Sequence, residues 1–185
     1  RFTQTGENSP SGSRSQTRPA HQTDRDSSMH FSSRTDIEAP IDFVYAALSD
    51  LEAWERAAMR RGADVNRTDK LRAPGVGMGW HVVFRFRGKQ REVDIRLTGQ
   101  EPGAKLAFSG AGRMLEADLS VDLLALSPKR TRMVLHTDVR PLTLAARLFL
   151  QSMKLAKGRV QTKLNNRMEQ LSTEMESRFA ASRPR

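Results

Sequence analysis

The sequence of 185 residues contains no cysteine, and only 6% of its residues are aromatic. Without cysteine the chain forms neither disulfides nor thiolate metal sites, so a disulfide-stabilised secreted fold is excluded. Charged residues interrupt every apolar stretch well before the roughly 20 residues that a membrane-spanning helix needs. The sequence also opens without the charged and then apolar leader of a secreted protein. From these absences we expect a cytoplasmic protein.

Acidic residues are scarce relative to basic ones. The chain has 31 Lys and Arg residues against 21 Asp and Glu residues, which gives a formal net charge of +10. Residues 1–28 hold four arginines and three acidic residues, so nearly all of the positive excess belongs to the rest of the chain. A surplus of this size favours acidic partners, such as nucleic acid or anionic lipid, or serves only solubility.

Hydrophobic residues are nearly missing from residues 1–28, which contain only Phe2 and Ala20 beside ten Ser and Thr residues. Such a segment buries too little apolar surface to offset the entropy lost on ordering, so we predict a disordered tail. Because Met29 immediately precedes the first patterned segment, the tail is either an added segment or an extension upstream of the natural start. Residues 29–185 have the length of a single domain.

The patterned part of the chain opens with a strand and two short helices. Apolar and polar residues alternate from Phe31 to Ile37, which predicts the strand. Pro40 suits the first turn of a helix, and apolar residues follow it at helical spacing. We expect Asp50 to cap a second helix that ends at Gly62.

Residues 63–140 show the alternation and the turn chemistry of an antiparallel meander. Turn-forming residues cluster at 74–75, 87–89, 101–103 and 127–130, and they divide the region into strands. Within each strand one parity is apolar and the other is mostly polar or charged. This pattern is typical of a sheet with one face in water.

A break at Pro141 precedes a predicted long helix that runs to about Arg178. Its apolar residues are spaced three or four apart and form a stripe that must be buried. Only the apolar face of the sheet is large enough to cover this stripe. We therefore predict an α+β helix-grip fold, in which a strand, two short helices and an antiparallel meander are followed by a long C-terminal helix packed across the concave face of the sheet.

The eighteen residues from Ile37 to Trp54 (IEAPIDFVYAALSDLEAW) resemble the opening signature of the SRPBCC, or START-like, superfamily. This group includes polyketide cyclase/dehydrase, lipid-transport, coenzyme-Q-binding and birch-pollen-allergen-like domains. There the signature joins the first strand to the paired helices. The resemblance implies a hydrophobic cavity between the long helix and the sheet, over roughly residues 30–180.

Apolar residues on the inner parity of the strands and on the facing helices are the expected lining of this cavity. Gly158 is notable because a glycine inside a helix costs about 1 kcal/mol relative to alanine. It indicates either close approach of helix and sheet or room for a bulky ligand. The full set of candidate ligand-binding residues is Trp54, Met59, Met78, Trp80, Phe84, Ile95, Leu119, Met133, Leu135, Phe149, Met153 and Gly158.

Two further groups of residues concern access to the cavity and its polarity. The glycine-rich segment 75–79 is expected to be a flexible loop at the cavity mouth, where it would serve as a lid. The hydroxyls of Ser109, Thr131 and Thr137 are expected to point inward. They either orient a ligand or are satisfied by hydrogen bonds within the core.

The sequence offers no catalytic residue that we assign, no metal-ligand set and no cofactor motif. His81 and His136 fall on the polar parity of their strands, without the neighbours of a metal site. The glycines at 75–79 precede a strand, whereas a dinucleotide-binding motif follows one. Asp50, Glu52 and Glu55 serve either as caps and surface charges or as acids at the cavity rim.

The predicted C-terminal helix carries a second set of features. Six basic residues between Arg147 and Arg167 are accompanied by no acid, but they scatter around the helix. Leu144, Leu148 and Leu155 lie opposite the main apolar stripe. They form a dimer contact, touch a membrane, or pack under the short helices, and we favour the last.

Three functional hypotheses follow. The leading one is the binding or transport of a small hydrophobic ligand, such as a lipid, polyketide-like or isoprenoid compound, in the cavity. The second is a cyclase- or dehydratase-type enzyme that uses the same cavity, although missing catalytic groups favour a protein that is not an enzyme. The third is a basic module that binds anionic membrane or nucleic acid, with nucleic acid the less favoured of these two partners. The protein is expected to be a monomer or a homodimer without metal or cofactor.

Overall fold

The computed structural model describes residues 28–86 and 88–182. The segment predicted to be a disordered tail therefore lies outside the described residues, apart from Ser28. Seven antiparallel strands form one sheet in the order β1-β7-β6-β5-β4-β3-β2. The elements are β1 (Met29–Ile37), α1 (Ile41–Ser49), α2 (Leu51–Arg60), β2 (Asp64–Arg67), β3 (Gly79–Phe86), β4 (Lys89–Glu101), β5 (Lys105–Ala111), β6 (Leu115–Ser127), β7 (Arg130–Pro141), α3 (Leu144–Leu155) and α4 (Lys157–Ser182).

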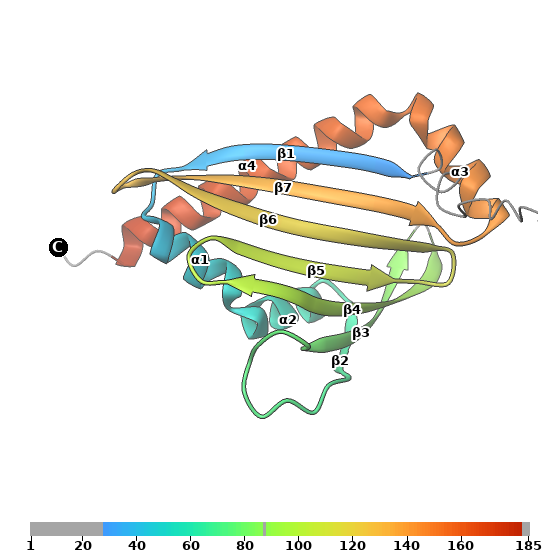
Figure 1. Cartoon of the computed structure of the whole chain (residues 1–185), viewed down its shortest axis with the longest axis horizontal. Coiled ribbons are helices and arrows are strands. Elements are labelled where there is room, and N and C mark those ends of the chain that lie inside the picture. Colours follow the sequence, from blue (N-terminus) through green and yellow to red (C-terminus); the bar gives the residue numbers. More distant parts are fainter. Residues whose placement is uncertain (1–27, 87, 183–185) are drawn as a thin grey trace, which may run out of the picture.

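The predicted helix-grip architecture is confirmed. The long helix α4 packs across the concave face of the sheet, chiefly against β1 (Figure 1). Helix α1 lies toward one end of the sheet together with the β6–β7 hairpin, and α3 lies at the opposite end. Within the described residues, each helix is too short or too polar to cross a bilayer.

Local side-chain chemistry sets the ends of the short helices as predicted. The Asp50 carboxylate accepts a hydrogen bond from the backbone N–H of Ala53 at 3.0 Å, which caps α2. Gly62, just beyond α2, has a φ of +87°, a conformation that glycine adopts without steric cost. At the start of α3 the Thr143 hydroxyl accepts a hydrogen bond from the N–H of Ala146 at 3.1 Å.

The strand register separates an apolar inner face from a polar outer face. One inner row runs across the sheet through Phe31, Thr137, Leu119, Phe108 and Leu97. The adjacent outer row contains His30, Asp138, Asp118 and Ser109. Ser109 was predicted to point inward. That prediction is wrong because Ser109 pairs with Asp118 in the outer row.

The C-terminal region corrects one prediction, because the single helix expected over residues 142–178 is divided at Ala156. The N–H of Ala156 bonds to the carbonyl of Met153 at 2.9 Å, which closes the last turn of α3. The chain changes direction there, and α4 returns along the sheet (Figure 1). This bend lets Ala146 and Leu150 stay buried at one end of the sheet while Met168 and Met175 are buried in the core farther along.

Gly158 lies in the first turn of α4 and is exposed. A methyl group added at this position would meet no atom within 4 Å. The close packing on the sheet suggested by the sequence is therefore wrong, whereas room for a ligand at Gly158 stays a prediction. The glycine has little cost here because it follows the helix break and is not inside a continuous helix.

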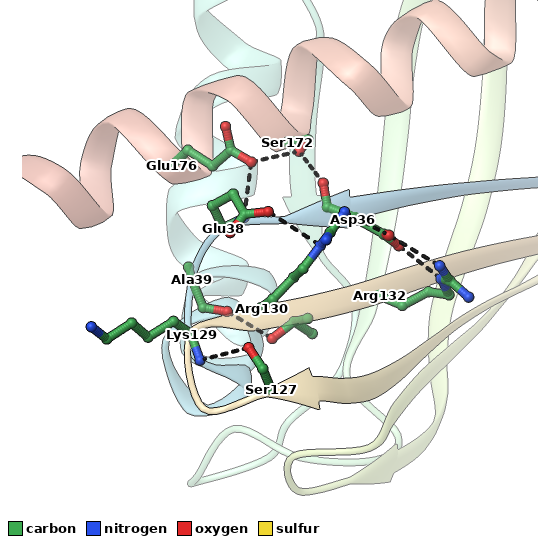
Figure 2. Close-up of polar contacts among 10 residues, drawn as sticks. Asp36, Glu38, Ala39, Ser127, Lys129, Arg130, Arg132, Ser172 and Glu176 are labelled. Carbon is green, nitrogen blue, oxygen red and sulfur yellow. Dashed lines mark hydrogen bonds and ion pairs between the residues drawn. The ribbon is translucent and has the colours of Figure 1, made fainter.

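A polar network ties α4 to the sheet at the α1 end, and we call it the Asp36 network (Figure 2). Arg132 donates two hydrogen bonds to the Asp36 carboxylate, at 2.7 and 3.0 Å, and Arg130 pairs with Asp36 and Glu38. The Ser172 hydroxyl of α4 donates to the backbone carbonyl of Asp36 at 3.0 Å. The hydrogen bonds from Arg132 hold the pKa of Asp36 below its usual value.

Candidate functional site

A cavity of about 540 Å³ opens at the α3 end of the sheet. Strands β3 to β7 form its floor and sides, and α3 forms its roof. The volume lies within the range of about 300–1,000 Å³ that is typical of small-molecule sites. The cavity is lined by Phe84, Phe86, Gln90, Arg91, Glu92, Val93, Gly110, Gly112, Arg113, Met114, Leu115, Glu116, Ala117, Val139, Ala146 and Phe149.

Small side chains in register across the sheet create this hollow. One inner row passes through Ile95, Gly110, Ala117 and Val139, so its centre contains only a glycine and an alanine. A Cβ atom at Gly110 would first meet Val93 at 3.6 Å, an ordinary van der Waals distance. In the next inner row the large side chains of Leu97, Phe108 and Leu119 fill the equivalent space above the sheet. The cavity ends where this row begins.

Helix α3 closes the cavity with one small and one large residue. Ala146 is fully buried and faces the hollow, whereas Phe149 is 42% exposed and lies at its rim. The Thr143 cap fixes the start of this helix, and the N–H of Leu142 bonds to the carbonyl of Met114 at 2.8 Å. The roof is thus tied to the β5–β6 turn, which forms one side of the mouth.

Charged residues near the cavity lie toward its edge, and the acid Glu116 is engaged in an ion pair. Arg140 donates hydrogen bonds to Glu116 at 2.8 Å and to Asp118 at 2.7 Å. These two carboxylates raise the pKa of Arg140 further above its usual value. The Glu116 charge is therefore compensated by Arg140, and the remaining lining is mostly apolar.

Two of the twelve residues predicted from the sequence line this cavity, namely Phe84 and Phe149. Met153 lies half-buried on α3, the helix that roofs the cavity. Leu119 belongs to the large-residue row that bounds the hollow, and Ile95 to the row that contains it. These five residues are close to the proposed site or within it.

The other predicted residues lie elsewhere. Trp54 and Met59 are half-exposed on α2, and the Trp54 indole N–H donates to the Leu48 carbonyl at 3.2 Å. Gly158 is exposed on α4, as described above. The remaining four, Met78, Trp80, Met133 and Leu135, pack in the hydrophobic core.

Sequence reasoning missed the small residues that make the cavity, above all Gly110, Ala117 and Ala146. The predicted lining consisted mainly of large apolar side chains, which fill space and do not leave it open. A usable signal was present, because Gly110 and Ala117 occupy apolar-parity positions in strands whose other inner positions carry large residues.

The glycine-rich segment 75–79 is not a lid at this cavity. Met78 is 1% exposed, and its carbonyl accepts a hydrogen bond from the Leu97 N–H at 2.9 Å. The Gly77 N–H donates to the Leu97 carbonyl at 2.8 Å, which continues the ladder between β3 and β4. The segment joins the start of β3, whereas Phe84 and Phe86 at the other end of the strand line the cavity.

The acids of α2 are occupied in structural contacts. Glu55 accepts a hydrogen bond from the Trp80 indole, and Arg67 lies 3.8 Å from the Glu55 carboxylate. Arg67 also donates two hydrogen bonds of 2.8 Å to Asp69 and thereby lowers the pKa of that carboxyl. Asp50 caps α2. None of these acids is among the residues that line the cavity.

Other polar candidates are also satisfied away from the cavity. Thr131 is fully buried and its hydroxyl donates to the Ala39 carbonyl at 2.8 Å, so it is a satisfied core hydroxyl. His81 hydrogen-bonds with Asp94 at 2.8 Å on the outer face, and this contact raises the pKa of His81. His136 is exposed on the same face. In the described part of the chain, no three His, Asp or Glu side chains converge as a metal ion would require.

A second depression, of about 430 Å³, lies on the outer face of the sheet. Its side chains include His30, Lys105, Asp118 and His136, and it is more open than the cavity under α3. Because it is this open to solvent, it is poorly suited to enclose an apolar molecule.

No family model matches the sequence, and no curated protein gives a significant match. Solved structures do match. The Zhui aromatase/cyclase from Streptomyces sp. R1128 has a TM-score of 0.59 at 15% identity, over 82% of this chain and 95% of that chain. Norcoclaurine synthase from Thalictrum flavum, solved with dopamine and hydroxybenzaldehyde, has a TM-score of 0.60 at 8% identity, over 85% and 90% of the two chains.

A START superfamily protein from Mycobacterium smegmatis matches with a TM-score of 0.52 at 14% identity, over 77% of this chain and 98% of that chain. Together these structures show that the chain has the START-like, helix-grip fold. The resemblance predicted from residues 37–54 is thus confirmed at the level of fold. Sequence identities this low carry no activity from those proteins to this one.

Proposed function

We propose that the protein binds a small, mostly apolar molecule in the cavity at the α3 end of its sheet. The observation that carries the proposal is the row of small residues, Gly110 and Ala117, beneath the Ala146 roof. A row of this kind leaves unfilled apolar space in an otherwise close-packed interior, and such space is costly unless something occupies it. The cavity volume of about 540 Å³ suits a compound of modest size.

The structural neighbours give coarser support to the same idea. An aromatase/cyclase and a synthase solved with two aromatic compounds share this fold. In this chain, however, Asp50 and Glu55, which the sequence offered either as structural acids or as acids at the rim, have structural partners. Carriage or sequestration of the ligand is therefore favoured over turnover. The cytoplasmic location expected from the sequence stays a prediction.

The proposal is tested by titration with Nile red, a neutral dye whose fluorescence rises in apolar surroundings. The parent protein is expected to bind the dye saturably. The variant Ala117→Leu places a larger side chain in the cavity and should weaken binding by at least about tenfold, which corresponds to 1.4 kcal/mol. Its stability should change little because the added atoms enter open space.

Two variants serve as controls. Ala111→Leu makes the same change on the outer parity of the neighbouring strand β5, and it should leave dye binding unchanged. Leu148→Glu alters an exposed apolar residue of α3 outside the cavity lining, which tests whether the dye simply adheres to that surface. No saturable binding by the parent, or equal effects of Ala117→Leu and Ala111→Leu, would contradict the proposal.

A further inference from the structure

The outward face of α3 carries three leucines that the fold leaves exposed. Leu144, Leu148 and Leu155 are 73%, 61% and 94% exposed. At 100° per residue they lie within about 40° of one another around the helix and form one stripe. The prediction that they pack under the short helices is therefore wrong.

This stripe continues onto the mouth of the cavity. Leu142 is half-exposed just before α3, and its N–H bonds to the carbonyl of Met114, another exposed apolar residue. We call these five residues, Met114, Leu142, Leu144, Leu148 and Leu155, the α3 patch. Exposed apolar surfaces that are continuous in this way mark sites of interaction. Because Met114 also lines the cavity, the patch borders its entrance.

Positive charge borders the α3 patch. Arg147 and Lys154 lie along one border of the leucine stripe, and Arg113 precedes Met114. The sequence contains no acidic residue between Asp138 and Glu169, so the whole of α3 and the first half of α4 are basic. The surface thus combines exposed leucines with a basic margin.

We propose that the α3 patch docks on an anionic phospholipid bilayer. A helix that lies in a membrane interface presents leucines to the acyl boundary while lysine and arginine reach the headgroups. A second copy of the chain fits less well, because a symmetric contact would bring the two basic margins together. Docking would place the cavity mouth at the lipid surface. It requires no occupant in the cavity, so its test is independent of ligand binding.

The test is co-sedimentation of the full chain with vesicles of phosphatidylcholine, with and without phosphatidylserine. Binding is expected to the vesicles that contain phosphatidylserine and to be much weaker with phosphatidylcholine alone. Leu148→Glu should abolish most of this binding. Lys154→Gln should weaken it by about fivefold, as expected for one basic residue near an anionic surface.

The matched controls lie at the other end of the sheet. Leu124 is 58% exposed on β6, so Leu124→Glu makes the same change at a similar exposure and should leave binding intact. Lys129→Gln in the β6–β7 hairpin is the charge control. The proposal is overturned if neither vesicle is bound or if Leu124→Glu is as damaging as Leu148→Glu. It is also overturned if ultracentrifugation shows a dimer that Leu148→Glu dissociates while vesicle binding is unaffected.

Discussion

The two ends of the sheet use the same strands but are filled differently. Near α1, Ile37 and Met133 from the sheet meet Met168 and Met175 from α4, and all four are nearly or fully buried. Near α3, the corresponding space faces Gly110, Ala117 and Ala146 and stays hollow. Side-chain size within a shared backbone frame therefore decides where this fold is solid and where it has a cavity.

The two ends also differ in how polar groups secure them. The solid end has the Asp36 network and the buried hydrogen bond of Thr131, which link β1, β7, α4 and the segment before α1. At the hollow end, the Thr143 cap and the Leu142–Met114 hydrogen bond hold the roof helix. We therefore expect the solid end to carry most of the stability and the hollow end to accommodate change.

The largest expected effect comes from truncating one apolar side chain at each end. Met133→Ala, in the solid core, should lower the free energy of unfolding by about 2–5 kcal/mol. Phe149→Ala, at the rim of the cavity, should cost only about 1 kcal/mol or less because its side chain is already half-exposed. Urea denaturation of both variants measures the two losses. Equal losses would show that the α3 end is packed as tightly as the core.

A pair of threonines gives the next largest contrast. Thr131→Val removes the buried donor to the Ala39 carbonyl and should cost about 1–3 kcal/mol. Thr137→Val, in the same strand but only half-buried, should change stability by no more than about 0.5 kcal/mol. Thermal melts of the two isosteric variants decide the matter, and a larger effect at Thr137 would contradict this account.

A smaller effect, of opposite sign, is expected at Gly110. Its φ is not positive, and a methyl group fits there at ordinary contact distance. Because alanine lowers the conformational entropy of the unfolded chain, Gly110→Ala should raise the free energy of unfolding by about 0.4–1 kcal/mol. At Gly99 the added methyl would lie 3.2 Å from the Ala107 Cβ, so Gly99→Ala should raise the free energy of unfolding by less or not at all. A marked destabilisation by Gly110→Ala would mean that the floor of the cavity is already filled.

The smallest expected effect is a dependence of stability on pH through Asp36. Arg132 holds the pKa of this carboxyl below its unfolded value, so folding favours the charged form. The resulting stabilisation is present above the unfolded pKa and is lost as the pH falls below about 4 toward the folded pKa. It should be modest because both side chains are partly exposed. Urea denaturation across this pH range should show a weaker pH dependence of the free energy of unfolding for Asp36→Asn than for the parent. An unchanged pH dependence would show that the Asp36 carboxylate does not contribute to stability in this way.

The architecture was predictable because its signals are local. Alternation in the strands, the Asp50 cap and the glycine after α2 each depend on neighbours in sequence, and the structure confirms them. The resemblance carried by residues 37–54 then supplied the order in which these elements pack.

The site was harder to predict because it depends on register. Gly110 and Ala117 form a hollow because they pair directly across β5 and β6. The sequence of a single strand does not determine which residues of the neighbouring strand it pairs with. The division of the C-terminal helix at Ala156 is similarly nonlocal. It lets α3 cover the end of the sheet while α4 covers the core, and no proline marks it in the sequence.

Methionine-methyl NMR tests the central claim most directly, because the eight methionines are spread over both ends of the molecule. Titration with Nile red should shift the methyl resonance of Met114, which lines the cavity, through the ring currents of the bound dye. The resonances of Met133, Met168 and Met175 in the solid core should stay in place. Shifts confined to these core methionines, or no saturable shift at Met114, would contradict the assignment of the binding cavity to the α3 end.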